Sequence, residues 1–323
     1  MQSPRQQSAP VAAHTRCACC GYSIAHAGAA VDGTFCSTTC RDVGVDGFTA
    51  VPADKLTSTW VNPIDVDLPY GMPRNACVLL VGEDDALEAA LQAELAWRRL
   101  QAGEPVVLVS FNDTPISVIE QFLLLDWNVL PFLETGQLEL VDSFTRYEEP
   151  ATMVDSRRGS WVEHVLRFVE PQTRTLRDPT DIQELGNVLV RTVREGGMYN
   201  RGCVLIDSLT EFATTVPPIR AHQFVKDVRA RVCKARFVPL FAGATIADAD
   251  VFPLNMTHVM DGRIDIRLHE IDDSVMRREL CVRKMDGVPV IARWQAIAHD
   301  PGSGYYRLDR PGPMGHPGSS PGP

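Results

Sequence analysis

The stretch VLLVGEDDALEAALQAEL, from Val78 to Leu95, places a strongly apolar strand pattern directly before a glycine and a helix-forming run. A strand, a glycine and a helix in this order are how a phosphate-binding loop begins, because such a loop holds backbone N–H groups at a helix N-terminus. Where phosphate would sit, however, the chain carries Glu83, Asp84, Asp85 and Glu88. The stretch therefore predicts the frame of an α/β nucleotide-binding fold whose side chains do not match that use.

Outward from this stretch, strand-like and helix-like patterns alternate from Pro73 to Ala298. Such alternation is typical of an α/β domain built around a mostly parallel sheet flanked by helices. Two later segments, Gly262–Glu270 and Arg277–Lys284, alternate charged and apolar residues and predict an antiparallel pair. The candidate strands of the parallel part are Cys77–Val81, Val106–Phe111, Leu138–Val141, Cys203–Ile206 and Phe237–Ala242, and the candidate helices are Leu87–Gln101, Pro115–Leu125, Asp181–Arg194 and Ala221–Lys234.

Composition divides the chain further. Residues 1–13 and residues 299–323 are predicted to be disordered tails, the second because it ends in the Pro/Gly/Ser-rich run PGPMGHPGSSPGP. Residues 14–48 hold a cysteine cluster, residues 49–72 are interpreted as a linker, and residues 73–298 form the α/β domain. A chain of 323 residues with 45% apolar residues is long enough for one large and one small domain.

The chain is acidic, with 41 acidic and 31 basic residues and a formal net charge of -10. This balance argues against broad nucleic-acid binding, which usually needs a basic face. No apolar run approaches the roughly 18–20 residues of a membrane span. The N-terminal residues lack the apolar core of a signal peptide. We therefore expect a cytoplasmic protein with no membrane partner.

Five of the nine cysteines lie between Cys17 and Cys40. The pair Cys17-x2-Cys20 is followed, after fifteen residues, by the pair Cys36-x3-Cys40. Zinc takes four thiolate or imidazole ligands in a tetrahedron, and two short-spaced pairs joined by a loop can supply them. The spacing therefore predicts a structural zinc site, and the zinc would supply much of the folding energy of so small a unit.

Cys19 is left over from this ligand set, although a register that uses Cys17 and Cys19 stays open, and His14 and His26 are alternative ligands. The segment resembles the small zinc ribbons of the TRASH/MYM kind, whose C-x2-C-G and F-C-S-x2-C elements match CACCG and FCSTTC here. The resemblance covers only about 30 residues. It implies a zinc-stabilised unit that contacts protein, senses metal or caps the chain, with DNA reading as a minor alternative.

A second resemblance, over roughly 220 residues, is to the KaiC-type ATPase domains of the RecA superfamily. GMPR at 71–74 is similar to the family's G-[LI]-P-x-G start, and AGEPVVLVSFNDTP at 102–115 to its second strand. LLLDWNVLPFLETGQLELVDSF at 123–144 resembles the passage that leads into the third strand. CVLIDSLTEF at 203–212 resembles the Walker B strand, and RRELCVRKMDGVP at 277–289 resembles the late strand that ends in K-M-R-G. The resemblance implies a RecA-like fold.

The phosphate loop of that family, GxxxxGK[ST], uses a second glycine, a lysine on the phosphates and a hydroxyl on Mg²⁺. With Gly82 as the first glycine, these three positions are Leu87, Glu88 and Ala89. Each like-charge contact at ~4 Å costs about 1 kcal/mol in water and roughly 4 kcal/mol at an effective dielectric of 20. Binding of ATP and Mg²⁺ in the usual way is therefore not expected.

The acidic loop also has two other interpretations. Asp84 or Asp85 can cap the helix that starts near Ala86, since carboxylates complement the positive end of a helix. The loop would then be an ordinary capped turn between a strand and a helix. A remodelled cation site made from the same carboxylates is the alternative.

Three further family positions are altered or weakly informative. The paired catalytic glutamates correspond to Asn112 and Asp113. Asp207 stands at the Walker B position, although an aspartate that ends a buried strand is also a common helix cap. The late motif keeps Lys284 but has Asp286 in place of arginine, and in hexameric relatives these basic residues reach the neighbour's nucleotide.

The sequence thus favours a catalytically inactive KaiC/RecA-like regulatory or signalling interaction protein, similar to proteins related to the gas-vesicle regulator GvpD and to the HTR-like proteins of salt-loving archaea. One alternative is a divergent ATPase that uses Asp113, Asp207 and Lys284. Another is a zinc-ribbon DNA-binding transcriptional regulator. We expect protein partners, and a monomer or dimer in preference to a hexamer because of Asp286.

Overall fold

The computed structural model describes residues 17–18, 33–45, 55–83, 85–145, 159–246, 256–272 and 275–308. The chain divides into two compact units, Met1–Lys55 and Leu56–Pro323, each of which is described by itself. The tail predicted over residues 1–13 lies outside the described residues. No helix within the described ranges is long and apolar enough to cross a membrane.

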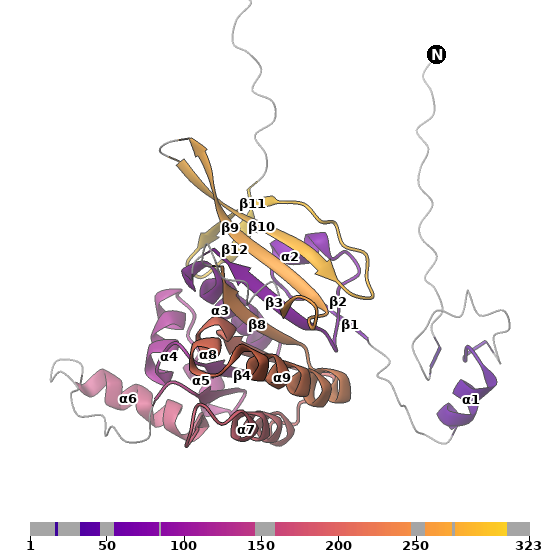
Figure 1. Ribbon diagram of the computed structural model, residues 1–323, viewed down its shortest axis with the longest axis horizontal. Helices are drawn as coiled ribbons and strands as arrows, with labels where there is room; N and C mark the ends of the chain where they lie inside the picture. Colours follow the sequence, from indigo (N-terminus) through magenta and orange to yellow (C-terminus); the bar gives the residue numbers. More distant parts are fainter. Residues whose placement is uncertain are drawn as a thin grey trace, which may run out of the picture. The chain divides into compact units, whose positions relative to one another are not determined.

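The larger unit is built around a ten-stranded sheet with the order β12-β11-β10-β9-β3-β8-β7-β4-β5-β6 (Figure 1). The strands from β9 to β6 run parallel, and β10, β11 and β12 extend the sheet antiparallel, which confirms the predicted α/β class. The strands are β3 Cys77–Gly82, β4 Val106–Ser110, β5 Leu138–Asp142, β6 Thr173–Thr175, β7 Cys203–Asp207, β8 Leu240–Thr245, β9 Gly262–Asp272, β10 Val275–Met285, β11 Gln295–Asp300 and β12 Gly304–Arg307. A separate two-stranded sheet pairs β1 Leu56–Thr57 with β2 Met72–Pro73.

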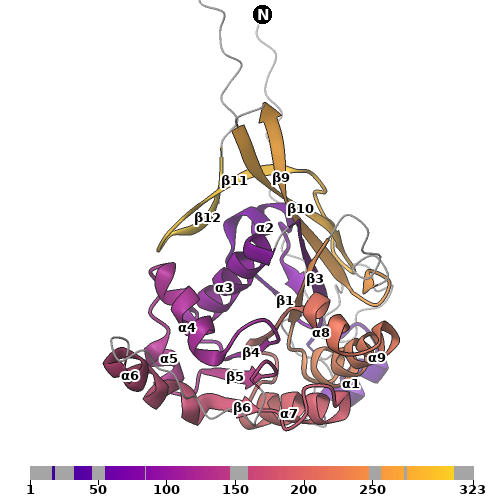
Figure 2. The same ribbon diagram turned by 60° about the vertical axis from the view of Figure 1, so that its left-hand side comes forward.

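Helices cover both faces of this sheet, because its central strands are apolar on both sides (Figure 2). In β3, Val78 and Leu80 pack with the helices of one face, and Leu79 and Val81 with those of the other. The first face carries α2 Asn62–Asp67, α3 Asp85–Gln101, α4 Pro115–Leu124, α5 Leu130–Glu134 and α6 Gly159–Val169. The second carries α7 Ile182–Glu195, α8 Leu209–Thr215 and α9 Pro218–Val228, and the short helices η2 Glu170–Gln172 and η3 Arg229–Lys234 follow α6 and α9.

Helix starts follow local sequence signals. Thr114 caps α4, with Pro115 at its first position, and its hydroxyl accepts from the Ser117 N–H. Asp181 caps α7 in the same way. The predicted strand Phe237–Ala242 begins three residues later than expected, at Leu240. Phe237 has a left-handed backbone with φ of 57°, which a strand does not accept.

The segment predicted to be a linker, residues 49–72, differs from that expectation from Leu56 onward. Val61, Ile64, Leu68 and Met72 are each at most 2% exposed and belong to the core of the larger unit. Their spacing of three to four residues suits one face of the short helix α2 and the turns beside it. The start of this segment, residues 49–54, lies outside the described residues.

The predicted C-terminal tail also differs at its beginning, because residues 299–308 complete the sheet through β11 and β12. The indole N–H of the fully buried Trp127 donates to the Gly302 carbonyl at 3.1 Å. The Tyr305 N–H donates to Glu94 Oε2 at 2.6 Å. This segment is therefore fixed by contacts with α3 and with the turn before α5, and only residues 309–323 lie outside the described residues.

Candidate functional site

The stretch that decides the fold forms a tight connection. β3 ends at Gly82 and α3 begins at Asp85, so only Glu83 and residue 84 separate the strand from the helix. A phosphate loop needs a longer curled backbone before its helix, since its lysine stands six residues after the first glycine. Here the last three of those intervening residues, 85–87, are already helical. Glu83 Oε2 accepts the Leu268 N–H at 2.8 Å and so ties the connection to β9.

Glu88, at the position of the family's lysine, lies inside the fold. Its side chain is 1% exposed and accepts a hydrogen bond from the amide of Gln92. It packs on the backbone of β8 at Gly243, where an added Cβ would lie 1.2 Å from Glu88 Oε1. The residue that would have to reach phosphate is therefore buried against β8. Asp84 is outside the described residues, as are the side chains of Asp85 and Leu87.

Asn112 and Asp207 meet at the carboxyl edge of the sheet. Asn112 follows β4 and Asp207 ends β7, and the two strands are neighbours, so the Asn112 amide donates to Asp207 Oδ1 at 3.1 Å. The adjacent Asp113 accepts the Gln121 amide at 2.6 Å. Partial burial raises the pKa of Asp113, and the hydrogen bond from Gln121 opposes this only in part. These sequence-predicted positions do form one cluster.

The cluster lines a hollow of about 510 Å³, which we call the carboxyl-edge crevice. The crevice lies between two connections that run to opposite faces of the sheet. The chain after β4 continues into α4 on one face, and the chain after β7 continues into α8 on the other. Open α/β sheets bind their ligands at such a switch point. The described residues that line the crevice are Ala89, Phe111, Asn112, Asp113, Gln121, Phe144, Asp207 and Glu211, which include three carboxylates and no cation.

Sequence reasoning missed four residues of this region. Phe111 and Phe144 directly follow β4 and β5, Glu211 lies in the first turn of α8, and Gln121 lies within α4. The first three could have been found from the rule that residues just after parallel strands gather at one edge. Gln121 could not, because nothing in a helix sequence shows which polar residue turns towards a neighbouring loop.

Lys284 and Asp286 lie at the other end of the strands. Met285 pairs with Gly262, which pairs with Val78 at the start of β3, whereas Gly82 at its end pairs with Ile266. Lys284 Nζ donates to the Met260 carbonyl at 2.9 Å and lies 3.4 Å from Asp286 Oδ2. The fold of one chain therefore does not bring Lys284 to the carboxyl-edge crevice.

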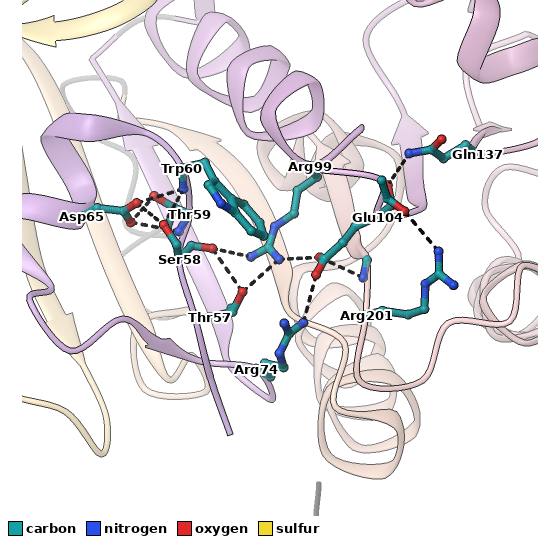
Figure 3. Close-up of polar contacts among 12 residues, drawn as sticks. Thr57, Ser58, Thr59, Trp60, Asp65, Arg74, Arg99, Glu104, Gln137 and Arg201 are labelled. Carbon is teal, nitrogen blue, oxygen red and sulfur yellow. Dashed lines mark hydrogen bonds and ion pairs between the residues drawn. The ribbon is translucent and has the colours of Figure 1, made fainter. Parts of the chain in front are cut away.

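The amino ends of β4 and β7 hold a different polar cluster (Figure 3). Arg99, which is fully buried, pairs with Glu104 at 2.6 Å and donates to the Ser58 carbonyl at 3.0 Å. Its guanidinium lies 4.4 Å from the ring centroid of Trp60. Arg74 pairs with the second oxygen of Glu104 at 3.2 Å. We call these five residues the amino-edge network; it joins the chain before β2 to the helix α3.

In the smaller unit, three cysteines lie together. The sulfur atoms of Cys17, Cys36 and Cys40 are all within 4.8 Å of one another, and those of Cys36 and Cys40 are 3.6 Å apart. Two thiolates on one tetrahedral zinc ion lie about 3.8 Å apart, given Zn–S bonds of about 2.3 Å. Ser37 caps α1 Thr38–Val45 by accepting the Cys40 N–H at 3.1 Å, which fixes Cys40 in the first turn of the helix.

The spacing of these sulfur atoms fits a zinc ion. The predicted fourth ligand, Cys20, lies outside the described residues, as do the alternatives Cys19, His14 and His26. The four cysteines of the larger unit, by contrast, are buried among apolar side chains, as small hydrophobic residues are: Cys77, Cys203, Cys233 and Cys281.

Residues 57–296 match the family model described as the KaiC ATPase. The chain is 28% identical over 236 residues to a UPF0273 protein of Thermotoga maritima, with 72% of this chain and 88% of the relative covered. It is 26% identical over 234 residues to a UPF0273 protein of Pyrococcus horikoshii, with 72% and 86% covered.

A crystal structure of a KaiC-like protein from Pyrococcus horikoshii has the same fold, with a TM-score of 0.60. The two chains are 14% identical, and the match covers 79% of this chain and 99% of the other. Because the family model spans well over half of its 323 residues, the protein belongs to the KaiC ATPase family.

Proposed function

We propose that this protein is a KaiC-family member that has lost ATP binding and hydrolysis and acts as a regulatory or signalling interaction protein, with a zinc-stabilised N-terminal unit. Protein partners are its expected ligands, and it works as a monomer or dimer.

The observation that carries this proposal is the placement of Glu88. Glu88 stands where the family uses a lysine. Its side chain is buried between α3 and β8, against Gly243, and does not reach the connection between β3 and α3. The connection from Gly82 to Asp85 is also too short to curl around phosphates. At the crevice, Asn112 takes the place of a catalytic carboxylate and is engaged with Asp207. A nucleoside triphosphate in this crevice would be repelled by three carboxylates, and no cationic side chain is among the described lining residues.

The test is a calorimetric titration of the full chain with Mg-ATP, combined with a phosphate-release assay. We expect neither binding nor release. The double variant Glu88→Lys/Ala89→Thr restores two of the motif's side chains, and we expect it to bind no nucleotide either, because Leu87 and the acidic residues before it remain. Micromolar binding of Mg-ATP by the unaltered chain would overturn the proposal.

The zinc site is tested separately. Purified protein should carry about one zinc ion per chain, and Cys36→Ser or Cys40→Ser should lower the metal content. The matched control is Cys281→Ser in the larger unit, which removes a buried thiol outside the cluster and should leave the metal content unchanged. Equal metal loss in Cys281→Ser would contradict a site built from the N-terminal cysteines.

The two alternatives have less support. A divergent ATPase that uses Lys284 would need that residue from a neighbouring copy, since in one chain it lies at the far end of the strands. A DNA-binding role would need a basic surface on the smaller unit, where Arg41 is paired with Asp42 at 3.0 Å. A DNA-binding isotherm with a steep salt dependence would favour the second alternative.

A further inference from the structure

The two edges of the ten-stranded sheet are closed to different degrees. At the edge formed by β12, the Tyr305 N–H is taken up by the Glu94 carboxylate of α3 at 2.6 Å. The other edge is formed by β6, which lies beside α7 (Figure 2). Within the described part of the chain, β6 pairs with β5 on one side and with no strand on the other.

The open side of β6 carries backbone groups without partners. The Leu176 N–H donates to the Asp142 carbonyl of β5 at 3.1 Å, and successive residues of a strand direct their backbone groups to opposite sides. Thr173 and Thr175 therefore direct theirs away from β5. The Thr173 N–H is used locally by the Glu170 carbonyl. The Thr173 C=O and the N–H and C=O of Thr175 remain, and none of them has a backbone partner among the described residues. Unpaired groups of this kind are a template for a further strand.

The side chains of such a strand would lie over α7 at every second position. Arg174 is opposite Val141 in the pairing of β6 with β5, and Val141 belongs to the core on the α7 face of the sheet. Residues opposite each other in neighbouring strands share a face, so Arg174 is on the α7 face too. Its ion pair with Glu195 of α7, at 3.1 Å, agrees with this direction.

A hollow of about 440 Å³ lies between β6 and α7, and we call it the edge groove. Thr175 lines it together with three arginines, Arg174, Arg177 and Arg191. Among the described lining residues, Glu184 is the one carboxylate. The residue with open backbone groups and three guanidinium groups therefore border the same hollow.

Two of these three guanidinium groups are not neutralised. Arg174 is already paired with carboxylates at 3.1 and 3.5 Å, and Glu184 accepts two backbone N–H groups of the preceding turn at 3.3 and 3.2 Å. Arg177 and Arg191 are exposed, and neither forms an ion pair with any residue that the structure describes. A guanidinium group binds a carboxylate through charge-assisted hydrogen bonds, so these two arginines select for an acidic ligand.

The shape of the edge adds to this selection. A short edge strand with charged side chains discourages pairing with most other strands, and like charges repel a basic one. A strand with carboxylates at every second position meets no such repulsion, because its acids would lie on the face that carries Arg177 and Arg191. In strand addition generally, backbone hydrogen bonds supply affinity and alternate side chains supply specificity.

We propose that the open edge of β6 and the edge groove bind an extended acidic peptide segment of a partner protein, which adds a strand to the sheet. Thr173 and Thr175 pair with its backbone, and Arg177 and Arg191 bind its carboxylates. This inference rests on the interaction role proposed above and gives the partner its chemistry.

The test is calorimetric titration of the full chain at about 0.15 M salt, where diffuse attraction is screened beyond about 8 Å. The main probe is a capped peptide of about seven residues, the length of an ordinary strand, in which glutamate and threonine alternate. One comparison peptide has glutamine in place of glutamate. Another keeps the glutamates but has methylated backbone nitrogens, so it carries the charges without the strand hydrogen bonds. Inorganic phosphate and Mg-ATP complete the set.

Three variants divide the contributions. Arg177→Gln/Arg191→Gln removes both charges and keeps amide donors. Thr175→Pro removes the outward N–H, which the pairing with β5 does not use, and proline is accepted on an edge strand in that position. The matched control Arg167→Gln/Arg220→Gln removes two charges from exposed positions of α6 and α9, outside the edge groove. Circular dichroism checks that each variant is folded, and the methylated peptide tests strand addition even if Thr175→Pro is not.

We expect the acidic peptide to bind. Arg177→Gln/Arg191→Gln should weaken this binding by at least about tenfold, as the loss of a charge-assisted hydrogen bond implies. Thr175→Pro and methylation of the peptide should each weaken it by at least about fivefold, since each removes backbone hydrogen bonds. The control variant should bind within about twofold of the unaltered chain, because distant exposed charges contribute little.

Other outcomes overturn the inference. No binding of the acidic peptide would do so, and so would equal binding of the glutamine peptide or equal weakening in the control variant. If phosphate or the methylated peptide bound as tightly as the acidic peptide, the edge groove would be a simple anion site without strand addition. Binding of Mg-ATP would overturn the proposed function, and this inference would then hold only if the acidic peptide bound with the stated dependence. If Mg-ATP and the acidic peptide were both silent, this inference alone would fail.

Discussion

The two ends of strands β4 and β7 differ in the groups that pair with their carboxylates. At their amino ends, Glu104 receives Arg99 and Arg74, and the first of these arginines is completely enclosed (Figure 3). At their carboxyl ends, Asp113 and Asp207 receive the amides of Gln121 and Asn112. The same strands thus join an end where a carboxylate pairs with guanidinium groups to an end where carboxylates accept hydrogen bonds from amides and where burial raises the pKa of Asp113, so that its charge is disfavoured. Groups kept at some cost to stability are candidates for function.

The largest effect should come from breaking the amino-edge network. Arg99→Ala leaves Glu104 with Arg74 as its one ion-pair partner among the described residues and removes the stacking on Trp60. Loss of one partner of a buried ion pair costs about 3–5 kcal/mol. Denaturant unfolding measures this loss. Arg201→Ala is the control, since the exposed Arg201 donates to the Gly103 carbonyl at the surface, and it should cost less than about 1 kcal/mol. Similar losses in the two variants would show that the buried Arg99–Glu104 pair contributes no more to stability than an exposed contact at the same end of the strands.

A second test replaces a matched acid. Asp261→Asn removes the charge that Arg229 and Lys234 share, and a hydrogen bond to a charged group contributes about 1.5–3 kcal/mol. Burial would raise the pKa of Asp261, but hydrogen bonds from Arg229, the Cys77 N–H and Lys234 outweigh it and lower the pKa below 3.8.

The sign of the pH dependence follows from this lowered pKa. The stabilisation by Asp261 is present above pH 3.8 and is lost as the pH falls through its lowered pKa in the folded state. The difference in unfolding free energy between Asp261→Asn and the unaltered chain should therefore shrink in acid. Asp227→Asn, in which the exposed partner of Arg231 is changed, is the control and should show a small difference at any pH. If the difference between Asp261→Asn and the unaltered chain grew in acid, the lowered pKa of Asp261 would be contradicted.

A third test concerns the buried carboxylate of Glu88, which lies against Gly243 of β8. Gly243→Ala places a Cβ against Glu88 and should destabilise the protein by about 1–3 kcal/mol, as overpacking usually does. The substitution Glu88→Ala removes the two nearest clashing atoms and leaves the amide nitrogen of Gln92, at 2.3 Å, as the third. Because the Gln92 amide ends a flexible side chain and loses its acceptor Glu88, it can move aside, so Gly243→Ala should cost less in that background. A double-mutant cycle of unfolding free energies measures this coupling, and additive effects would show that Glu88 does not lie on β8.

The smallest expected effect is a gain in stability, in contrast to the losses predicted above. Burial raises the pKa of Asp113, so its ionised form is disfavoured in the folded state, and the unaltered chain loses stability as the pH rises from 3.8 through the raised pKa. Asp113→Asn lacks this titration and keeps an acceptor for Gln121. It should be more stable than the unaltered chain at pH 7, by less than about 1 kcal/mol because the group is partly exposed. If Asp113→Asn were as stable as the unaltered chain at pH 4 but less stable at pH 7, ionised Asp113 would stabilise the folded state, and the raised pKa would be contradicted.

The parallel core of the fold was predictable from sequence because its signals are local. The strands Cys77–Val81, Val106–Phe111, Leu138–Val141 and Cys203–Ile206 are apolar runs bounded by turn residues, and each is found within one residue at either end. The antiparallel pair was predictable from its alternation. The two ends of the domain were not, because α2 has six residues and β12 four, too few for a periodic pattern to show, and they are held by distant partners such as Trp127.

For the candidate site, the sequence predicts which chemical groups are missing but not where their replacements point. The order of residues around Gly82 gives Glu88 in place of lysine, yet its burial depends on Gly243, which is 155 positions further on. The meeting of Asn112 and Asp207 follows from the pairing of β4 with β7, which two strand-end residues alone do not reveal. The cysteine spacing, in contrast, predicts its own geometry, because zinc ligands must lie close together. The zinc itself stays a prediction.

The contacts made by β12 bear on the order in which the chain can fold during synthesis. Trp127 and Glu94 precede the groups that hydrogen-bond to them, Gly302 and Tyr305, by 175 and 211 positions in the chain. At about 5–20 residues per second the ribosome takes many seconds to pass from one to the other. During that interval the Trp127 indole and the Glu94 carboxylate lack the hydrogen bonds that residues 302 and 305 supply in the finished domain, so this part of the fold is completed only after that segment has been made.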